Sequence, residues 1–177
     1  MDDLPPAIEL TMTDLCHIAG WAADCAERAL PIFEALAPND ARPRDAIDGA
    51  KVFARSGVRT ANLRKLAWAA QSAAKEVDEP SAAAAARAAS TAAATAYTHP
   101  IATSHQTSHI LSPAAYAAHA SALSASDGSD KGDAEVRWAI SHASPEVREL
   151  VQRFPPRPRS KGKLHALLYQ LDAGLRE

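Results

Sequence analysis

The spacing of apolar residues predicts that the chain is a series of amphipathic helices. Within residues 12–36, apolar or small side chains recur every three or four positions, so they share one face of a helix. The members of this stripe are Leu15, Ile18, Ala22, Cys25, Ala29, Ile32 and Leu36. Pro31 lies within this helix, and proline lacks the amide donor that the helical ladder needs. We therefore expect a kink near Pro31, or a helix that ends and restarts there.

The same spacing predicts further helices, whose ends are marked by proline, glycine and threonine. They are expected over residues 43–56, 60–77 and 80–97. Pro43 suits the first turn of the first of these helices, Gly57 ends it, and Thr60 caps the next one. The last of the three is almost entirely alanine. Because alanine permits close approach of neighbouring helices, we expect this helix at the centre of the molecule.

The C-terminal half of the chain is predicted to contain shorter helices and irregular stretches. Residues 97–112 form the least regular segment, after which Ser112 and Pro113 have the residue types that begin a helix. Residues 126–133 predict a flexible loop, and residues 1–10 predict a flexible N-terminal tail. The remaining helices are expected over residues 113–124, 133–143, 145–154 and 163–175.

Composition strengthens the helical prediction and excludes a core built on a sheet. The 177 residues include 42 Ala and only 7 Gly, and alanine favours helices and disfavours strands. A hydrophobic content of 47% and a charged content of 23% are ordinary for a globular protein. The length fits one domain. We therefore predict an all-α single domain over residues 1–177, a bundle or stack of about seven to eight helices.

Charge is distributed in blocks of alternating sign. The net charges of residues 1–48, 49–76, 77–136 and 137–177 are -7, +5, -4 and +4, within an overall net charge of -2. Such blocks suit helices that attract each other, or a surface with opposed patches. They do not form the broad basic field of a nucleic-acid-binding protein. We therefore expect no nucleic-acid partner.

The sequence also bears on the compartment of the protein. No apolar run approaches the length of a membrane span, and the first residues lack the basic-then-apolar pattern of a signal peptide. Cys16 and Cys25 lie nine residues apart on one predicted helix, which is too far for a disulfide. We expect a cytoplasmic protein that has reduced cysteines and no membrane partner.

A group of histidines is the main candidate for chemistry. Four of them lie within 21 residues of each other: His99, His105, His109 and His119. If their segment is helical, His105 and His109 point the same way, as a two-histidine metal clamp requires, with His99 or a nearby acid as third ligand. Gln106 stands where a zinc hydrolase would have its glutamate base. We favour a polar network that ties an irregular segment to adjacent helices, with His99, His105 and His109 close together and at least partly buried.

Other residue types in the sequence have structural interpretations that we favour over functional ones. Trp21, Trp68 and Trp138 are predicted to fill the core. Arg42 and Arg44 are weak candidates for gripping a carboxylate on a partner, and pairing with nearby aspartates is the favoured alternative. A basic run predicts a solvated linker; its members are Arg153, Arg157, Arg159, Lys161 and Lys163. No phosphate-binding loop, nucleophile elbow or paired-carboxylate motif is present, so we expect no catalytic residue and no cofactor.

Several stretches of the chain form a recognisable combination. The segment AADCAERALPIFE leads into PNDARPRDAI, and AWAA, YTHP, HQTSHIL and AAYA follow. Over about residues 10–175 this combination resembles the Imm5-like immunity protein family of bacterial polymorphic toxin systems. The most specific part of the resemblance is the pattern LPxFE followed by PxDxRPRxAI. The resemblance implies an all-α fold and binding of a cognate toxin, and it brings no catalytic residues with it.

The sequence therefore predicts a non-enzymatic binding protein, an immunity protein that neutralises a cognate toxin by direct contact. A metal-dependent helical-bundle enzyme is the alternative, with His105 and His109 joined by His99 or His119 as ligands. A scaffold or small-molecule-binding protein is a third interpretation. The binding surface and the oligomeric state do not follow from the sequence.

Overall fold

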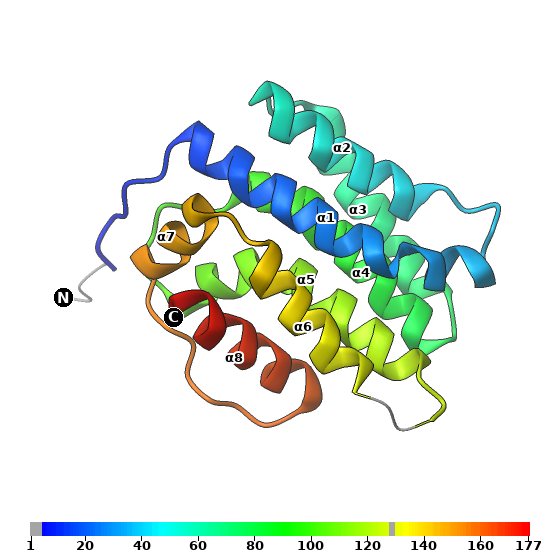
Figure 1. Cartoon of the computed structure of the whole chain (residues 1–177). Helices are drawn as coiled ribbons and strands as arrows, with labels where there is room; N and C mark the ends of the chain where they lie inside the picture. The colour runs from blue at the N-terminus through cyan, green and yellow to red at the C-terminus, as the bar shows by residue number, and fades with distance from the viewer. Residues whose placement is uncertain (1–4, 128–129) are drawn as a thin grey trace.

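The described part of the chain, residues 5–127 and 130–177, forms eight α-helices and one 3-10 turn in this computed structural model (Figure 1). In chain order they are α1 (Met12–Leu36), α2 (Arg42–Ser56), α3 (Ala61–Glu76), α4 (Pro80–Ala94), η1 (Thr95–Tyr97), α5 (Ser104–Ser124), α6 (Lys131–His142), α7 (Pro145–Arg153) and α8 (Lys163–Arg176). Outside helices, the described residues contain a single isolated antiparallel bridge, between Ala7 and Ile101. The prediction of an all-α, single-domain bundle is confirmed.

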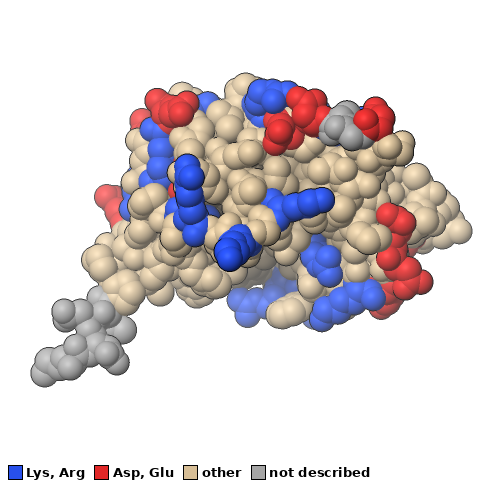
Figure 2. All heavy atoms as spheres, turned by 90° about the horizontal axis from the view of Figure 1, so that it is seen from below, with Lys and Arg blue, Asp and Glu red and all other residues tan. Residues whose placement is uncertain are grey.

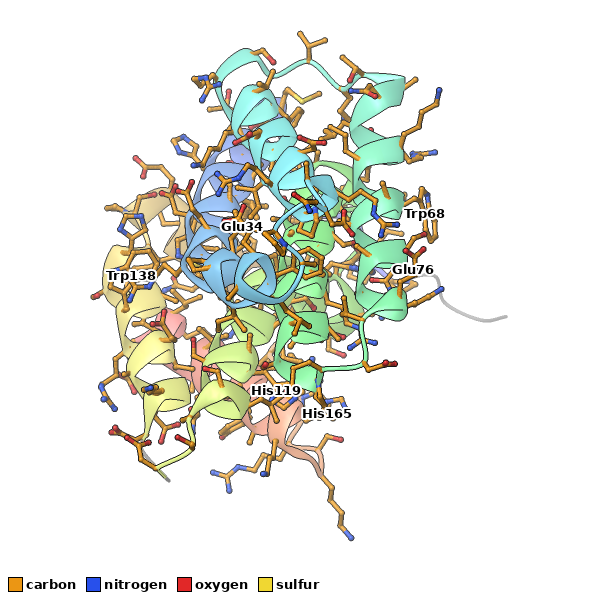
Figure 3. The ribbon with its side chains drawn as sticks, turned by 90° about the vertical axis from the view of Figure 1, so that its right-hand side faces the viewer. Glu34, Trp68, Glu76, His119, Trp138 and His165 are labelled. Atoms are coloured by element: carbon orange, nitrogen blue, oxygen red, sulfur yellow. The ribbon has the colours of Figure 1, made fainter. Side chains whose placement is uncertain are left out.

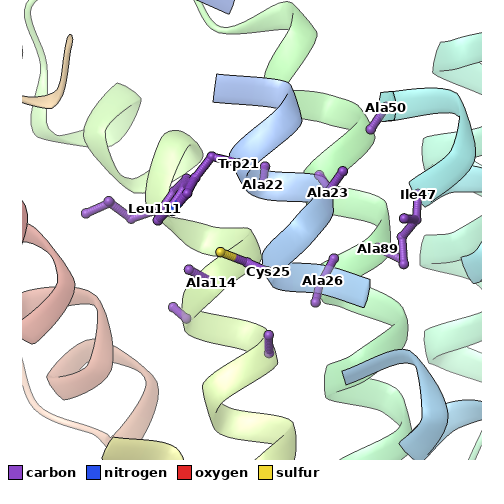
Figure 4. Packing of buried hydrophobic residues seen from close by; sticks show 14 of the residues in the cluster. Trp21, Ala22, Ala23, Cys25, Ala26, Ile47, Ala50, Ala89, Leu111 and Ala114 are labelled. Atoms are coloured by element: carbon purple, nitrogen blue, oxygen red, sulfur yellow. The ribbon is translucent and has the colours of Figure 1, made fainter. Parts of the chain in front are cut away.

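The alanine-rich helix α4 lies at the centre of the bundle, as the sequence predicted. It packs against α1, α2, α3 and α5, and 11 of its 15 residues are buried. Figure 1 shows α2 and α3 on one side of α1 and α6 to α8 on the other. The small side chains of α4 let its four neighbours approach closely, and Figure 4 shows Ala22, Ala23 and Ala26 of α1 at one such contact. The core is therefore built from many small side chains and few large ones.

Helix ends follow the local sequence closely. Side-chain oxygens accept first-turn backbone N–H groups at Thr11, Thr60, Thr103 and Ser144. Pro43 lies in the first turn of α2, where its missing amide costs nothing. Gly57 ends α2 with a φ of +66°, in the left-handed region that glycine enters without strain. The predicted roles of Pro43, Gly57 and Thr60 are thus confirmed.

Helix α5 corrects the prediction for residues 97–124. The segment predicted as irregular becomes helical at Ser104, and α5 then continues unbroken through Pro113. Ser112 is therefore inside a helix and does not cap one. Its hydroxyl donates to the Ser108 carbonyl at 2.6 Å, and the Ser108 hydroxyl donates to the Ser104 carbonyl at 2.9 Å. Hydroxyls that bond to the turn behind them leave the helical backbone intact, so this polar sequence continues as helix.

Helix α1 is likewise continuous through Pro31 to Leu36, so an end and restart at this proline is excluded. The kink stays a prediction. Two other boundaries differ from the sequence prediction. The helix expected over 80–97 ends at Ala94 and tightens into η1, and α6 begins at Lys131, inside the expected loop.

The two segments expected to be flexible are partly outside the described residues. Residues 1–4 of the expected tail 1–10 and residues 128–129 of the expected loop 126–133 are not described. The amide of Ile8 donates to the Pro100 carbonyl at 3.0 Å, and the amide of Ala102 donates to the Pro6 carbonyl at 2.9 Å. These bonds hold the described part of the N-terminal segment against the η1–α5 connection.

Two further expectations concern the cysteines and the membrane. Cys16 and Cys25 are both free thiols, as their separation along the helix predicted. Among the described helices, none combines the length and apolarity that crossing a bilayer requires.

Candidate partner-binding surface

The histidine segment begins at the turn that joins η1 to α5. His105 and His109 lie one turn apart on α5, and their Nε2 atoms are 3.0 Å from each other. His99, in the preceding connection, is close enough for its charge to act on His109. All three side chains reach solvent, so the expected burial is wrong for His99 and His105, whereas neighbouring atoms shield the His109 ring in part. Within the described residues, no three His, Cys, Asp or Glu side chains are grouped as a metal site requires.

The buried polar residues of this segment are its neighbours Gln106 and Thr107. The Gln106 side-chain carbonyl accepts the backbone N–H of His99 at 3.0 Å. The Thr107 hydroxyl donates to the Pro155 carbonyl at 2.7 Å. Within the predicted polar network, Gln106 and Thr107 therefore make the bonds that satisfy this segment. His105 and His109 stay at the surface because the helix turns Gln106 and Thr107 inward.

Burial and positive neighbours lower the pKa of two histidines in α5. For His109, partial burial lowers the pKa first, and positive charge on His105 and His99 adds to it. For His119, burial again lowers the pKa first, followed by the charges of Lys163 and Arg87. His119 lies in the C-terminal half of α5 and lines a hollow with Lys163 and Leu167 of α8, apart from the other histidines of the segment (Figure 3). Its buried Nδ1 has no hydrogen-bond partner among the described residues.

The two arginines that were weak candidates for partner binding are held by acids of this chain. Arg42 bonds to Asp40 at 2.7 Å and to Glu76 at 2.6 Å. The Asp40 and Glu76 carboxylates raise the pKa of Arg42, and Arg42 lowers the pKa of Asp40. Arg44 pairs with Glu34. These contacts join the α1–α2 turn to the ends of α1 and α3, so both arginines have a structural role.

The three tryptophans occupy three different environments. Trp21 is buried, and its indole N–H donates to the Ala139 carbonyl at 3.0 Å, as predicted for a core residue. Trp138 is half-buried, with the Arg28 guanidinium 4.2 Å above its ring and the His142 ring stacked on it. Trp68 is 67% exposed, so the prediction that it fills the core is wrong. It is the most exposed large apolar side chain of the described residues.

Trp68 is the centre of an aromatic and basic surface on α3, η1 and the connection before α3, which we call the Trp68 face. Its members are Arg59, Arg64, Lys65, Trp68, Lys75 and Tyr97. Figure 3 shows Trp68 projecting from α3 away from the bundle. Arg64 lies 4.5 Å from the centre of the Tyr97 ring and Arg59 lies 5.9 Å from it. The face therefore combines Trp, Tyr and Arg, the residue types enriched where proteins bind each other tightly.

Two hollows adjoin Trp68. One, of about 490 Å³, extends toward the C-terminal half of α3 and is lined by Gln71, Lys75 and Ser90. The other, of about 440 Å³, extends toward the start of α3 and is lined by Arg59, Thr60 and Lys65. Arg64, Trp68 and Tyr97 line both. Side chains of a partner would therefore find space on both sides of the indole ring.

The basic side chains of the Trp68 face have no acid from the described part of this chain beside them. Residues 52–75 contain five bases and no acid. Within the described residues, no carboxylate lies in ion-pair range of Arg59, Arg64, Lys65 or Lys75. Arg28, Arg42 and Arg44, in contrast, each have one. The positive charge of this face is thus free to act on another molecule.

The basic run at the C-terminal end is a second positive surface, and most of its side chains have partners. In Figure 2, Lys and Arg gather across the face seen from below, and acids lie mainly toward its edges. Arg153 pairs with Asp14 at 3.0 Å. Arg157 donates to the Ser108 hydroxyl at 2.7 Å, and Arg159 lies over the Tyr169 ring. The run is an exposed linker that several of its own side chains tie to the bundle.

The molecule is thus a small helical protein with an exposed aromatic and basic surface. A family model described as "Imm-5 like putative immunity protein" matches residues 10–146. The chain belongs to this Imm5-like immunity protein family, as the sequence resemblance indicated. No curated protein and no solved structure matches it. The matched residues include the whole Trp68 face, whereas the basic linker and α8 lie beyond them.

Proposed function

We propose that this protein binds a cognate toxin directly in the cytoplasm and neutralises it without catalysis of its own. The observation that carries this proposal is the family match over residues 10–146, which assigns most of the chain to an immunity protein family. An immunity protein of this kind needs a stable scaffold and a surface complementary to its toxin. The alanine-centred bundle is such a scaffold, and the Trp68 face supports the proposal with side chains suited to protein contact.

Coexpression with the toxin tests this function in living cells. A candidate toxin gene, sought beside the gene of this protein, is expressed alone, with this protein, and with an unrelated helical protein as control. We expect growth arrest by the toxin, rescue by this protein and no rescue by the control. The purified pair should also elute together in size-exclusion chromatography. Arrest that persists at equal expression of the two proteins would refute the proposal.

A metal-dependent enzyme is the alternative, and the close approach of His105 to His109 is the observation that favours it. Their Nε2 atoms, 3.0 Å apart, are near enough to ligate one ion together. Thermal unfolding of untagged protein with and without zinc separates the two functions, because a bound ion stabilises the folded state by mass action. We expect the melting temperature to stay nearly unchanged. A large rise that is lost in His105→Ala would favour the enzyme.

A further inference from the structure

We propose that the Trp68 face is the surface on which the partner docks, and that the partner presents an acidic segment with an apolar side chain beside Trp68. This inference rests on the proposed function, since it names the surface and the partner chemistry through which toxin binding would occur. Three features of the described residues carry it. They are the exposed indole ring, the unpaired positive charges, and the contacts that position Tyr97 and Arg64 beside the ring.

The indole ring of Trp68 provides the apolar part of the interaction. The ring is 67% exposed, although the opposite face of α3 is buried in the bundle. Hollows of about 490 and 440 Å³ adjoin it. Its N–H group has no acceptor among the described residues, so it is free to donate to a partner. A partner side chain in either hollow would cover the ring and remove apolar surface from water. A single exposed leucine would not offer this combination of area and hydrogen bonding.

The charge of the Trp68 face selects an acidic partner. Four bases line the two hollows beside the ring, and none has a carboxylate within ion-pair range among the described residues. The whole chain, in contrast, carries a net charge of -2. A local positive patch on a weakly negative molecule attracts an acidic surface in one orientation. A basic or neutral partner would leave these charges without compensation.

The aromatic and guanidinium groups are already held in place. The Tyr97 hydroxyl donates to the Thr60 carbonyl at 3.2 Å, and its ring carries the Arg64 guanidinium at 4.5 Å. Beneath them, the buried Ser90 hydroxyl donates to the Ala67 carbonyl at 2.8 Å and joins α4 to α3. Because these contacts already position Tyr97 and Arg64, less conformational entropy is lost at these two side chains when a partner arrives.

A protein segment fits this surface better than a nucleic acid does. Aromatic rings beside bases also bind single strands, which stack successive bases along a continuous basic groove. Here the Arg64 guanidinium already covers Tyr97, which leaves Trp68 as the one open ring of the face. The bases lie along α3 on both sides of this single open ring, whereas a single strand needs several open rings on which to stack successive bases. Nucleic-acid binding is therefore the competing outcome of the test.

Peptide binding tests the surface independently of any toxin. The probes are a labelled glutamate-rich peptide with a central phenylalanine, the same peptide with lysine for glutamate, and oligothymidylate. Fluorescence anisotropy with the full chain should show binding of the acidic peptide only, weakening with added salt and at least about 30-fold weaker in Trp68→Ala. Equal binding by wild type and Trp68→Ala, or tighter binding of oligothymidylate, would overturn the inference, as would no binding of the acidic peptide.

Variants and the toxin then separate this inference from the proposed function. Trp68→Ala and the double variant Arg64→Glu/Lys65→Glu are compared with the matched controls Leu36→Ala and Lys131→Glu/Lys161→Glu, which change exposed residues elsewhere. We expect a loss of toxin affinity of at least about 10-fold in the first pair only. Toxin binding that is equal in all variants would support the function and overturn this surface. No toxin binding by wild type would refute the function, and the peptide experiment would then decide the surface.

Discussion

Trp68 shows how one helical position changes the role of a side chain. The buried stripe of α3 runs through Leu63, Ala67, Ala70 and Ala74, and Trp68 directly follows Ala67 in the chain. One residue along a helix is a rotation of about 100°, which takes the indole ring out of the interface with α4. Residue type alone predicts a core tryptophan. Residue type together with the position of Trp68 around the helix, its phase relative to the apolar stripe, predicts a side chain at the edge of the buried face. The phase was the signal in the sequence that pointed to this surface.

Two glycines with different surroundings should respond oppositely to alanine. At Gly132, an added Cβ would lie 2.9 Å from the Ala122 Cβ and 3.2 Å from the Ala118 carbonyl oxygen, so α6 would have to move away from α5. At Gly20, the nearest atom is the Ala54 Cβ at 3.6 Å, which is ordinary contact. We expect Gly132→Ala to lower the free energy of unfolding by about 1–3 kcal/mol. We expect Gly20→Ala to raise it by up to about 1 kcal/mol. Urea unfolding measures both, and changes of equal sign would contradict this account.

Thr107 should contribute more to stability than the histidines beside it. Its hydroxyl is fully buried and holds the Pro155 carbonyl, so Thr107→Val would leave that carbonyl without its donor. The expected loss is about 1–3 kcal/mol. His105 is exposed, and its replacement by alanine should change stability by less than about 0.5 kcal/mol. Chemical denaturation of the two variants checks this ranking, and a larger loss in His105→Ala would reverse it.

At the scale of elements, the sequence predicted helices well where one strong signal marked each end. α1 and α2 begin and end within a residue of their predicted bounds, because a cap, a proline or a glycine defines each limit. The start of α5 was missed because two signals competed. Ser112 followed by Pro113 has the composition of a helix start, but Thr103 caps the helix earlier, and its side chain accepts the Gln106 amide at 3.3 Å. Only the packing of α5 against α1 and α4 decides between the two.

The cap of α7 offers a test at this scale. α7 has nine residues, and its first turn depends on Ser144, whose hydroxyl accepts the Val147 amide at 3.4 Å. Ser144→Ala should lower the free energy of unfolding by about 1 kcal/mol, because that amide loses its acceptor. Ser141→Ala is the control, since Ser141 is exposed and bonds only to a carbonyl of its own helix. Thermal or urea unfolding in which both variants lose the same stability would exclude a capping role.

At the scale of the whole molecule, the blocks of alternating charge mainly form surface patches of opposite sign. A minority of their charges pair to hold one helix against another. Of the six bases in residues 49–76, only Lys51 pairs with an acid of the N-terminal block, bonding to Glu27 at 2.6 Å. The positive charge of α3 is therefore left for other molecules. The sequence predicted the imbalance of charge, but which bases stay unpaired depends on how α3 is rotated against α4. The spacing of apolar residues in α3 indicates only that Trp68 lies outside the buried stripe, so the fold was predicted and the set of unpaired bases around Trp68 was not.

Protonation of two histidines should make the molecule less stable in mild acid. Folding lowers the pKa of His109 and His119 below the ordinary value of 6.5, through burial and through positive neighbours. The folded state then binds protons more weakly than the unfolded state, so the free energy of unfolding falls as the pH drops below about 6.5. Asp40, whose pKa is lowered from 3.8 by Arg42, loses its contribution only in stronger acid. Between pH 7.5 and 5, His109→Gln/His119→Gln should therefore lose less stability than wild type or the exposed control His165→Gln. Urea unfolding at both pH values measures this difference, and an equal loss in all three proteins would show that other groups cause the acid sensitivity.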